Sequence, residues 1–344
     1  MSESRIRVGI VGAGKNTKKV HIPELQAIED VEIVSVCNRS RRSSERVASQ
    51  FNIPTIYAEW WDLVSAADTD TIVIGTWPYM HCPVTLAALE AGKHVLCEAR
   101  MAMNAEEATQ MLAASKASPH LVTQVVPSPF TLHVDRKIKR LIAEGYLGEL
   151  LAIEVRANGN EFLDPESPLH WRQDANFSGL NVMNLGIWYE ALMRWVGEAN
   201  QVIAMSKTCV KMRRDLESGF MKTISIPEHL NVVADMACGA QASFSISNIA
   251  GLSGEDSAYL YGSEGTLRFA SGKLYSGRNG DIKLKEMVIP PEERGRWRVE
   301  EEFINAIRGI ESVALTTFAD GVKYMKFTEA VSQSIVERKA ISVA

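Results

Sequence analysis

The chain has 344 residues, of which 46% are hydrophobic and 23% are charged, and its formal net charge is -5. Because ordinary domains hold about 100–200 residues, this length predicts two domains. The balanced composition excludes a disordered chain. The small net charge argues against nucleic acid as a partner, since the longest basic cluster is only Arg39–Arg42. We therefore expect a globular protein whose partner is a small-molecule substrate.

The cysteines and the apolar segments indicate the compartment. The cysteines are odd in number and far apart, at Cys37, Cys82, Cys97, Cys209 and Cys238. This spacing predicts reduced thiols and no metal site. The first residues lack the apolar core of a signal peptide, and no apolar run reaches the ~18 residues of a membrane span. These features predict a cytoplasmic protein without a membrane partner.

Strand-like and helix-like segments alternate through the first 125 residues. Short β-branched runs predict strands at 6–11, 31–36, 71–74, 94–96 and 121–125. Helical spacing predicts helices that end near Ala27 and others at 39–50, 84–91 and 105–115. Such an alternation predicts right-handed βαβ units and a parallel sheet that is covered on both faces.

The pattern changes after Pro127 and Pro129. A predicted helix at 134–144 is followed by strand-like segments at 150–156, 201–207, 230–236 and 241–247, and by helices near 298–307 and 321–339. Their loops and hairpin-like turns predict an open, mostly antiparallel sheet with helices on one side. The predicted fold class is therefore α/β. We expect a Rossmann dinucleotide-binding domain at 1–125 and an α/β domain for substrate binding and oligomerisation at 126–344.

A glycine turn follows the first predicted strand. Gly12 permits a tight turn, and Gly14 lets the backbone approach a pyrophosphate at the N-terminus of the next helix. The third position of the G-x-G-x-x-G fingerprint is Thr17, so the motif alone also fits an ordinary βα turn. Lys15 and Asn16 complete the predicted phosphate-binding turn.

The end of the second predicted strand indicates which dinucleotide binds. An NAD site normally offers Asp or Glu here to the ribose hydroxyls, but this chain has Asn38 followed by Arg39, Ser40 and Arg42. Guanidinium groups and a hydroxyl suit a 2′-phosphate, which a carboxylate would repel. The sequence therefore predicts NADP(H) as the cofactor, with NAD(H) less favoured. The alternative is that the arginines only solvate the first turn of a helix.

Seven segments resemble the Gfo/Idh/MocA family (glucose-fructose oxidoreductase and inositol dehydrogenase-like) over nearly the whole chain. They are GAGKNTKKVHIPEL from Gly12, TDTIVIGTWPYMHCPVTLAALEAGKHVLCEA from Thr69, LGEL from Leu147, HWR from His170, SGLNVMNLGIW from Ser178, YGSEGTL from Tyr261 and RWRVEEEFINAIRG from Arg296. The resemblance implies an NAD(P)-dependent oxidoreductase that acts on sugars, polyols or related carbonyl compounds. It also implies a homodimer or homotetramer formed through the C-terminal sheet.

The resemblance also implies roles for individual residues. By motif match, the residues that border the cofactor are Thr76, Trp77, His81, Glu98, Trp171 and Arg172. Among these, Glu98 is expected near the nicotinamide ribose. His81 fits equally well as a helix residue without a chemical role, and His21 fits a structural role beside the glycine turn.

The acid/base positions depart from the family pattern. Most members have Glu-Lys-Pro where this chain reads Glu98, Ala99, Arg100, and an aspartate and a histidine where it has Asn184 and Trp188. None of the replacements can shuttle a proton at neutral pH. We therefore predict a non-standard acid/base group. The candidates are His170 first, then Tyr189, Tyr79 and His81, while Arg100 could bind a substrate carboxylate or a developing oxyanion.

Three functions remain open at this stage. The first is an NADP(H)-dependent oxidoreductase of a small polar carbonyl or alcohol, either sugar-like or carboxylated. The second is an enzyme that retains its cofactor through another net reaction, of the lyase, hydratase or glycosidase type. The third is a non-catalytic dinucleotide-binding sensor. We take the first as the prediction, because no separate DNA-binding or signalling domain supports the third.

Overall fold

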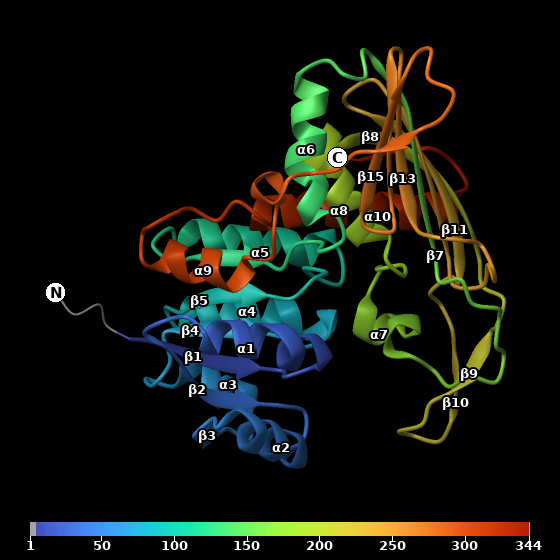
Figure 1. The fold of residues 1–344 in the computed structure, drawn as a ribbon. Helices are drawn as coiled ribbons and strands as arrows, with labels where there is room; N and C mark the ends of the chain where they lie inside the picture. Colours follow the sequence, from blue (N-terminus) through green and yellow to red (C-terminus); the bar gives the residue numbers. More distant parts are fainter. Residues whose placement is uncertain (1–4, 344) are drawn as a thin grey trace. The chain divides into compact units, whose positions relative to one another are not determined.

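The computed structural model describes residues 5–343, which form two compact units (Figure 1). The first unit contains the chain up to Pro127 together with Arg298–Val322, and the second contains Ser128–Trp297 and the chain from Lys323 onward. The division into domains at 1–125 and 126–344 stays a prediction. In the structure, a segment close to the C-terminus returns to the first unit.

The first unit holds a six-stranded sheet, in which every recorded strand pair is parallel. Its strands are β1 (Ile6–Val11), β2 (Val31–Cys37), β3 (Thr55–Ile56), β4 (Thr71–Ile74), β5 (His94–Cys97) and β6 (Thr123–Val125). The strand order is β3-β2-β1-β4-β5-β6. The chain adds β2 and β3 on one side of β1 and then adds β4, β5 and β6 on the other side. Dinucleotides bind at such a switch point, outside the carboxyl ends of the strands.

Helices from both ends of the chain cover this sheet. They are α1 (Ile22–Gln26), α2 (Arg41–Phe51), α3 (Trp60–Ser65), α4 (His81–Glu90), α5 (Ala105–Ala117) and α9 (Val299–Ile307). α1 packs beside α9, and α4 packs beside α3 and α5. Helical backbone begins before α1, at Lys15, and includes a π-helical stretch at Thr17–His21. The apolar strands are therefore shielded, and all four residues of β4 are buried.

The second unit holds a nine-stranded sheet of order β16-β15-β14-β13-β7-β12-β11-β8-β17. The strands are β7 (Leu150–Asn158), β8 (Ala199–Lys207), β11 (His229–Met236), β12 (Gln241–Ser247), β13 (Ser257–Gly262), β14 (Gly265–Ala270), β15 (Lys273–Arg278), β16 (Lys285–Glu286) and β17 (Ile341–Ser342). β7 and β12 are parallel, and the other described neighbours are antiparallel. The predicted α/β fold with a Rossmann sheet and an open, mostly antiparallel sheet is confirmed.

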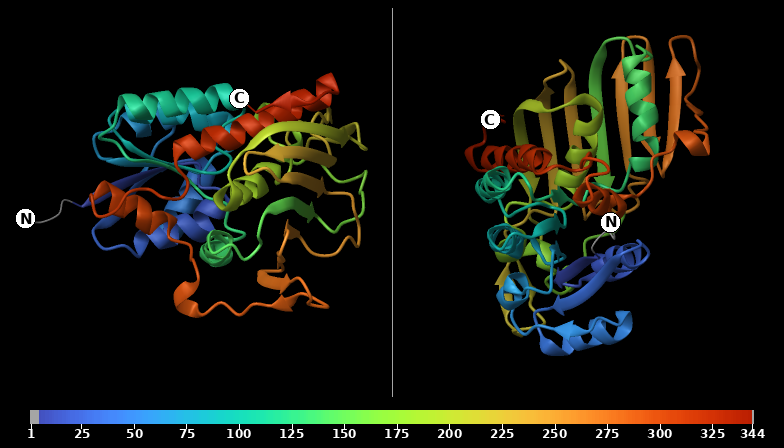
Figure 2. Two further views of the ribbon diagram at one scale, coloured as in Figure 1. Left: turned by 90° about the horizontal axis from the view of Figure 1, so that it is seen from above. Right: turned by 90° about the vertical axis from the view of Figure 1, so that its left-hand side faces the viewer.

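One face of this sheet carries helices (Figure 2). They are α6 (Leu132–Ala143), α8 (Leu185–Val196) and the part of α10 (Phe318–Glu337) from Lys323 onward. Strand residues alternate between buried and exposed, as along β11, because one face lies against these helices. A separate hairpin of β9 (Met212–Arg214) and β10 (Met221–Thr223) follows β8, and the short helix α7 (Ala175–Ser178) precedes α8.

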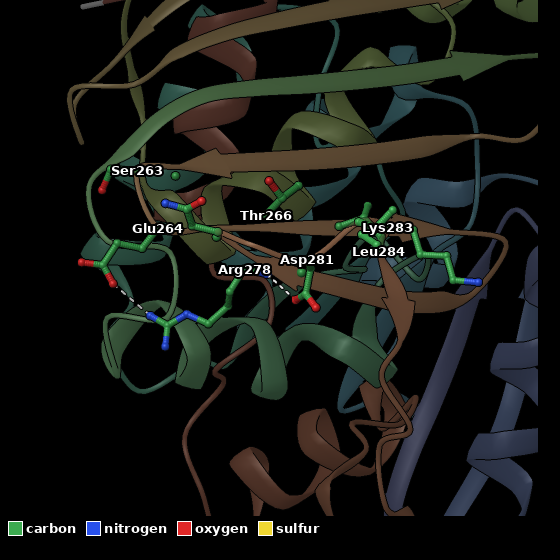
Figure 3. Close-up of a pocket in the computed structure, with 12 residues that line it drawn as sticks. Ser263, Glu264, Thr266, Arg278, Asp281, Lys283 and Leu284 are labelled. Atoms are coloured by element: carbon green, nitrogen blue, oxygen red, sulfur yellow. Dashed lines mark hydrogen bonds and ion pairs between the residues drawn. The ribbon is translucent and has the colours of Figure 1, made fainter.

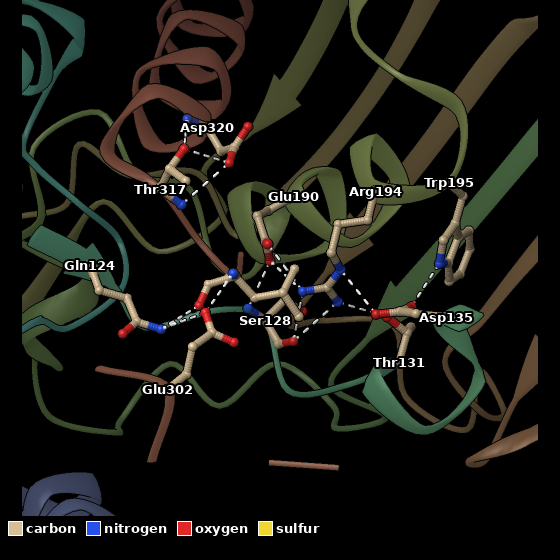
Figure 4. Close-up of polar contacts among 11 residues, drawn as sticks. Gln124, Ser128, Thr131, Asp135, Glu190, Arg194, Trp195, Glu302, Thr317 and Asp320 are labelled. Atoms are coloured by element: carbon tan, nitrogen blue, oxygen red, sulfur yellow. Dashed lines mark hydrogen bonds and ion pairs between the residues drawn. The ribbon is translucent and has the colours of Figure 1, made fainter. Parts of the chain in front are cut away.

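Two buried polar networks fix the helices (Figure 4). In the second unit, Nε of Arg194 lies 3.1 Å from Oδ2 of Asp135, and Nη1 donates to Glu190 at 3.0 Å, which joins α8 to α6. In the first unit, Glu302 of α9 accepts from the backbone N–H groups of Ala314 and Leu315 at 2.7 and 2.9 Å. No helix within residues 5–343 has the length and apolar character needed to cross a membrane.

Candidate functional site

The glycine turn after β1 has no room for larger residues. Gly12 has a φ of +85°, and a Cβ there would lie 2.5 Å from Cγ2 of Thr76. A Cβ on Gly75 would collide with the Thr17 hydroxyl and the Gly12 carbonyl. The Thr17 hydroxyl donates to the Gly12 carbonyl at 3.3 Å. Thr17 therefore closes the turn from inside, while Lys15 and Asn16 lie exposed at the start of the helix.

Asn38, at the end of β2, holds the glycine turn against α2. Its Oδ1 accepts from the N–H of Ala13 at 2.6 Å, and its Nδ2 donates to Oγ of Ser43 at 3.2 Å. Ser40 caps α2 by accepting the N–H of Ser43 at 3.3 Å. The amide of Asn38 therefore links the glycine turn to α2, and it brings no negative charge to the site.

A groove of about 350 Å³ lies over the turn and the start of α2. Its polar and aromatic walls come from Arg39, Ser40, Ser43, Arg46, Trp77 and Tyr79. The guanidinium of Arg39 lies 5.6 Å from the centroid of the Trp77 ring. Arg46 was missed in the sequence, although it lies three residues after Ser43 and so shares its helix face. Arg42, the predicted residue, is exposed on the same helix.

An aromatic pocket of about 330 Å³ adjoins this groove and shares Arg39, Thr76 and Tyr79 with it. Trp60 and Trp61 line its other side, with their ring centroids 5.7 Å apart in an edge-to-face arrangement. Aromatic walls of this kind suit a flat ring, and the arginine-lined groove suits an anion. The structure thus brings together the predicted residues of the glycine turn, the end of β2 and the loop after β4.

Glu98, after β5, belongs to a series of hydrogen-bonded polar side chains that runs from exposed Asn16 to buried His21 and Glu300. Its Oε1 accepts from Nδ2 of Asn16 at 2.6 Å and lies 2.9 Å from Nε2 of His21. The other ring nitrogen of His21 contacts Glu300 of α9. Burial lowers the pKa of His21, but the two carboxylates outweigh burial and raise it to about 9. Burial raises the pKa of Glu98, but His21 and Asn16 outweigh burial and hold it below its usual value.

His81 is fully buried and ties two loops together. Its Nδ1 lies 2.9 Å from the carbonyl oxygen of Arg100, and its Nε2 lies 3.1 Å from that of Thr76. Burial lowers the pKa of His81, although these carbonyl groups oppose the effect. The Arg100 side chain is also buried. This position favours a structural role for His81, holding the loops after β4 and β5.

The predicted residues of the second unit lie on two segments. His170 caps a short 3₁₀ turn, where its Nδ1 accepts the N–H of Arg172 at 3.3 Å. Burial and the nearby Arg172 charge both lower the pKa of His170, so that its ring is neutral at neutral pH. The Arg172 guanidinium lies 4.2 Å from the Trp171 ring centroid. Because Nδ1 accepts here, Nε2 carries the ring proton, and Nδ1 is the only nitrogen of the neutral ring that can accept another.

The start of α8 carries the other predicted residues. Asn184 is the N-cap, and Trp188 lies one turn further on, buried against Phe130 with ring centroids 5.4 Å apart. Tyr189 is fully buried, stacks on Phe327 at 3.6 Å, and its hydroxyl accepts the N–H of Ala199. Burial raises the pKa of Tyr189 well above its usual value. These contacts favour a core role for Tyr189, not an acid/base role.

A buried ion pair that the sequence did not reveal anchors the segment before His170. Nη1 of Arg213, on β9, donates to the carbonyl oxygens of Asp164 and Ser167 at 2.8 and 2.9 Å. Nη2 donates to Glu228 at 2.8 Å, and both side chains are almost wholly buried. Arg213 and Arg214 are adjacent in a polar hairpin, and nothing in the sequence distinguishes the buried arginine from the exposed one, so only the tertiary contact reveals this role.

A further pocket of about 350 Å³ lies at the ends of β13, β14 and β15 (Figure 3). Three of its charged side chains, Glu264, Arg278 and Asp281, have partners. Arg278 donates to Glu264 at 2.9 Å, and Lys285, nearby, donates to Asp281 at 3.2 Å. In the part of the chain that the structure describes, no three His, Cys, Asp or Glu side chains are grouped as metal ligands.

Comparison with known proteins identifies two domain families in the chain. A family model described as "Oxidoreductase family, NAD-binding Rossmann fold" matches residues 6–125, and one described as "GFO/IDH/MocA C-terminal domain" matches residues 136–268. Trans-1,2-dihydrobenzene-1,2-diol dehydrogenase of Mus musculus is 26% identical over 302 residues, which cover 87% of this chain and 84% of that protein.

One further relative aligns over part of the chain, and two solved structures align over nearly all of it. An uncharacterized oxidoreductase of Rhizobium meliloti is 28% identical over 204 residues, which are 58% of this chain and 59% of that protein. Among solved structures, levoglucosan dehydrogenase in its apo form has a TM-score of 0.87 at 21% identity, with 99% of each chain covered. An oxidoreductase domain protein from Kribbella flavida has a TM-score of 0.84 at 20% identity, covering 99% of this chain and 100% of that one. These structures share the fold of both units.

Proposed function

The chain belongs to the Gfo/Idh/MocA family of oxidoreductases with an NAD-binding Rossmann domain, and from this premise we propose an NADP(H)-dependent dehydrogenase of a small polar alcohol or carbonyl compound. The observation that carries the cofactor choice is the groove at the end of β2. It presents Arg39, Ser40 and Arg46, while the position that normally holds a carboxylate is Asn38.

The residues present fit a dinucleotide. The cradle at Gly12 and Gly75, which any Cβ would fill, lets the backbone approach a pyrophosphate closely. The helical N-terminus at Lys15 favours an anion there. Arg39 and Arg46 would then hold the 2′-phosphate, and the pocket of Trp60 and Trp61 would take the adenine ring.

An oxidised dinucleotide held at this turn would supply the hydride acceptor for an alcohol carbon, and the protein would supply the base that takes the hydroxyl proton as that carbon becomes a carbonyl. We propose His170 as this base. Its Nδ1 accepts the N–H of Arg172, so Nε2 carries the single proton of the neutral ring, and the lone pair on Nδ1 would take the hydroxyl proton in exchange for that hydrogen bond. Arg100, Asn184 and Trp188 remain predicted substrate-site residues. The named relatives act on a cyclic diol and on levoglucosan, which supports a ring-shaped polyol as the substrate class.

Cofactor titration tests the proposal. We expect NADPH to bind at least tenfold more tightly than NADH. Arg39→Gln and Arg46→Gln should each weaken NADPH binding about tenfold, the loss of one charge-assisted hydrogen bond, and leave NADH binding unchanged. Arg41→Gln is the matched control, because Arg41 lies on α2, as Arg46 does, and its guanidinium pairs with Glu45 at 3.0 Å. Tighter binding of NADH than of NADPH would contradict the cofactor assignment.

Absorbance of the reduced nicotinamide during turnover of polyols tests the reaction. A net change supports the dehydrogenase, product without a net change indicates a cofactor-retaining enzyme, and binding without turnover indicates a sensor. We also propose a homodimer or homotetramer that forms through the open face of the nine-stranded sheet. Ile203 and Val233 are paired neighbours on that face and are 46% and 40% exposed. Light scattering measures the oligomeric state, and a monomer at micromolar concentration would refute this part.

A further inference from the structure

A continuous chain of polar side chains crosses the first unit from the glycine turn to α9. Asn16 donates to Oε1 of Glu98 at 2.6 Å, and the same oxygen lies 2.9 Å from Nε2 of His21. Nδ1 of His21 contacts Oε1 of Glu300. His21 is 0% exposed and Glu300 is 1% exposed. This chain joins three segments that are distant in sequence.

The position of these polar side chains relative to the sheet indicates their role. Asn16 follows the glycine turn after β1, and Glu98 follows β5. In a sheet of this strand order, the adenosine half of a dinucleotide lies over the end of β2, so the nicotinamide half lies over the ends of β4 and β5. Asn16 and Glu98 therefore lie on the side of the turn that faces the nicotinamide half.

We propose that His21 and Glu300 are positioning residues, which hold Asn16 and Glu98 in the orientation that the nicotinamide half of the dinucleotide requires. The inference rests on the proposed function, since it needs a dinucleotide at this turn. Neither His21 nor Glu300 needs to touch the ligand. They act through Glu98, whose carboxylate reaches the surface of the site, with its side chain 14% exposed.

The chemistry of the chain supports this role. A histidine ring that carries protons on both nitrogens is positively charged and donates from both. His21 can therefore donate to Glu98 on one side and to Glu300 on the other. Its raised pKa, about 9, means that both hydrogen bonds persist at neutral pH. Glu98 then keeps its charge and direction, and Asn16 is fixed by the same oxygen. Glu300→Gln keeps an oxygen that can accept from Nδ1 but removes the negative charge that favours the second proton on His21, so the hydrogen bond from Nε2 to Glu98 becomes weaker.

The test separates the two halves of the ligand. NADPH spans the whole site, whereas 2′,5′-ADP carries only the adenosine half and never reaches Glu98. We expect His21→Gln and Glu300→Gln to raise the Kd of NADPH about tenfold and to leave the Kd of 2′,5′-ADP unchanged within twofold. The fluorescence enhancement of bound NADPH should also fall, because its nicotinamide ring is held less firmly. Glu24→Gln, an exposed carboxylate on α1, is the control and should change neither ligand.

Each outcome decides between the possibilities. Equal weakening of NADPH and 2′,5′-ADP means that His21 and Glu300 only stabilise the turn, and this overturns the inference, as does an unchanged Kd for both. If His21→Gln fails to fold, the conservative Glu300→Gln alone decides. A wild-type protein that binds neither NADPH nor NADH refutes the proposed function itself. If NADH binds more tightly, NADH and ADP replace the two probes and the same comparison applies.

Discussion

His21 should make the stability of the first unit depend on pH between about 6.5 and 9. Burial lowers the pKa of its ring, but Glu300 and Glu98 outweigh burial and raise it from 6.5 to about 9. A group whose pKa is higher in the folded state binds its proton more tightly there. The stabilisation from His21 is therefore complete below pH 6.5, declines as the pH rises, and is lost above pH 9.

The size of this effect follows from the pKa difference. The change from 6.5 to about 9 corresponds to roughly 3 kcal/mol of unfolding free energy. His21→Gln removes this contribution. At pH 6.5 the variant should be about 3–5 kcal/mol less stable than the wild type, because removing one partner of a buried ion pair leaves the carboxylates uncompensated. At pH 9.5 the gap between the two proteins should be smaller by roughly 3 kcal/mol.

Urea unfolding of both proteins at half-unit pH steps measures this gap. The difference between them isolates His21, because His81, His94 and the other titrating groups are present in both. His120→Gln, which removes an exposed histidine of the same unit, is the control for the loss of a histidine outside the buried ion pair. A wild-type minus His21→Gln difference that stays constant from pH 6.5 to 9.5 would refute the charged pairing of His21 with Glu98 and Glu300.

Three further changes test individual contacts. Arg213→Met leaves the buried carboxylate of Glu228 without its ion-pair partner, so it should lower the unfolding free energy of the second unit by about 3–5 kcal/mol and speed proteolysis before His170. Arg214→Met, a change at the exposed neighbouring residue, should do neither. Gly75→Ala should abolish dinucleotide binding in an equilibrium titration, because its Cβ would occupy the space of the Thr17 hydroxyl, and retained binding would refute this geometry of the turn. Tyr189→Phe should cost about 1–3 kcal/mol in urea unfolding, because the N–H of Ala199 loses its acceptor, while kcat stays unchanged; a large loss of kcat would restore Tyr189 as a catalytic candidate.

Much of the first unit follows from local sequence patterns. The β-branched runs predicted at 6–11 and 71–74 are β1 and β4 with the same bounds, because strands buried on both faces are nearly continuous apolar runs. The glycine turn was also readable, since only glycine tolerates the φ of +85° at position 12. Asn38 and Arg39 could be proposed as cofactor-site residues because they come directly after the second predicted strand. These features depend on residues that are close in sequence, where pattern and geometry are directly linked.

The contacts between distant segments came only from the tertiary structure. His21 and Glu300 are 279 residues apart, and no local pattern announces that α9 returns to the first unit to supply a carboxylate. Tyr189, which the sequence offers as a proton donor, faces the core of its unit because the hydrophobic face of α8 packs on Phe327. The sequence by itself thus determined the glycine turn and the lack of a carboxylate after β2, since these features reside in consecutive residues. Burial and long-range pairing decided which titratable side chains carry charge, because a pKa depends on neighbours that only the folded chain brings together.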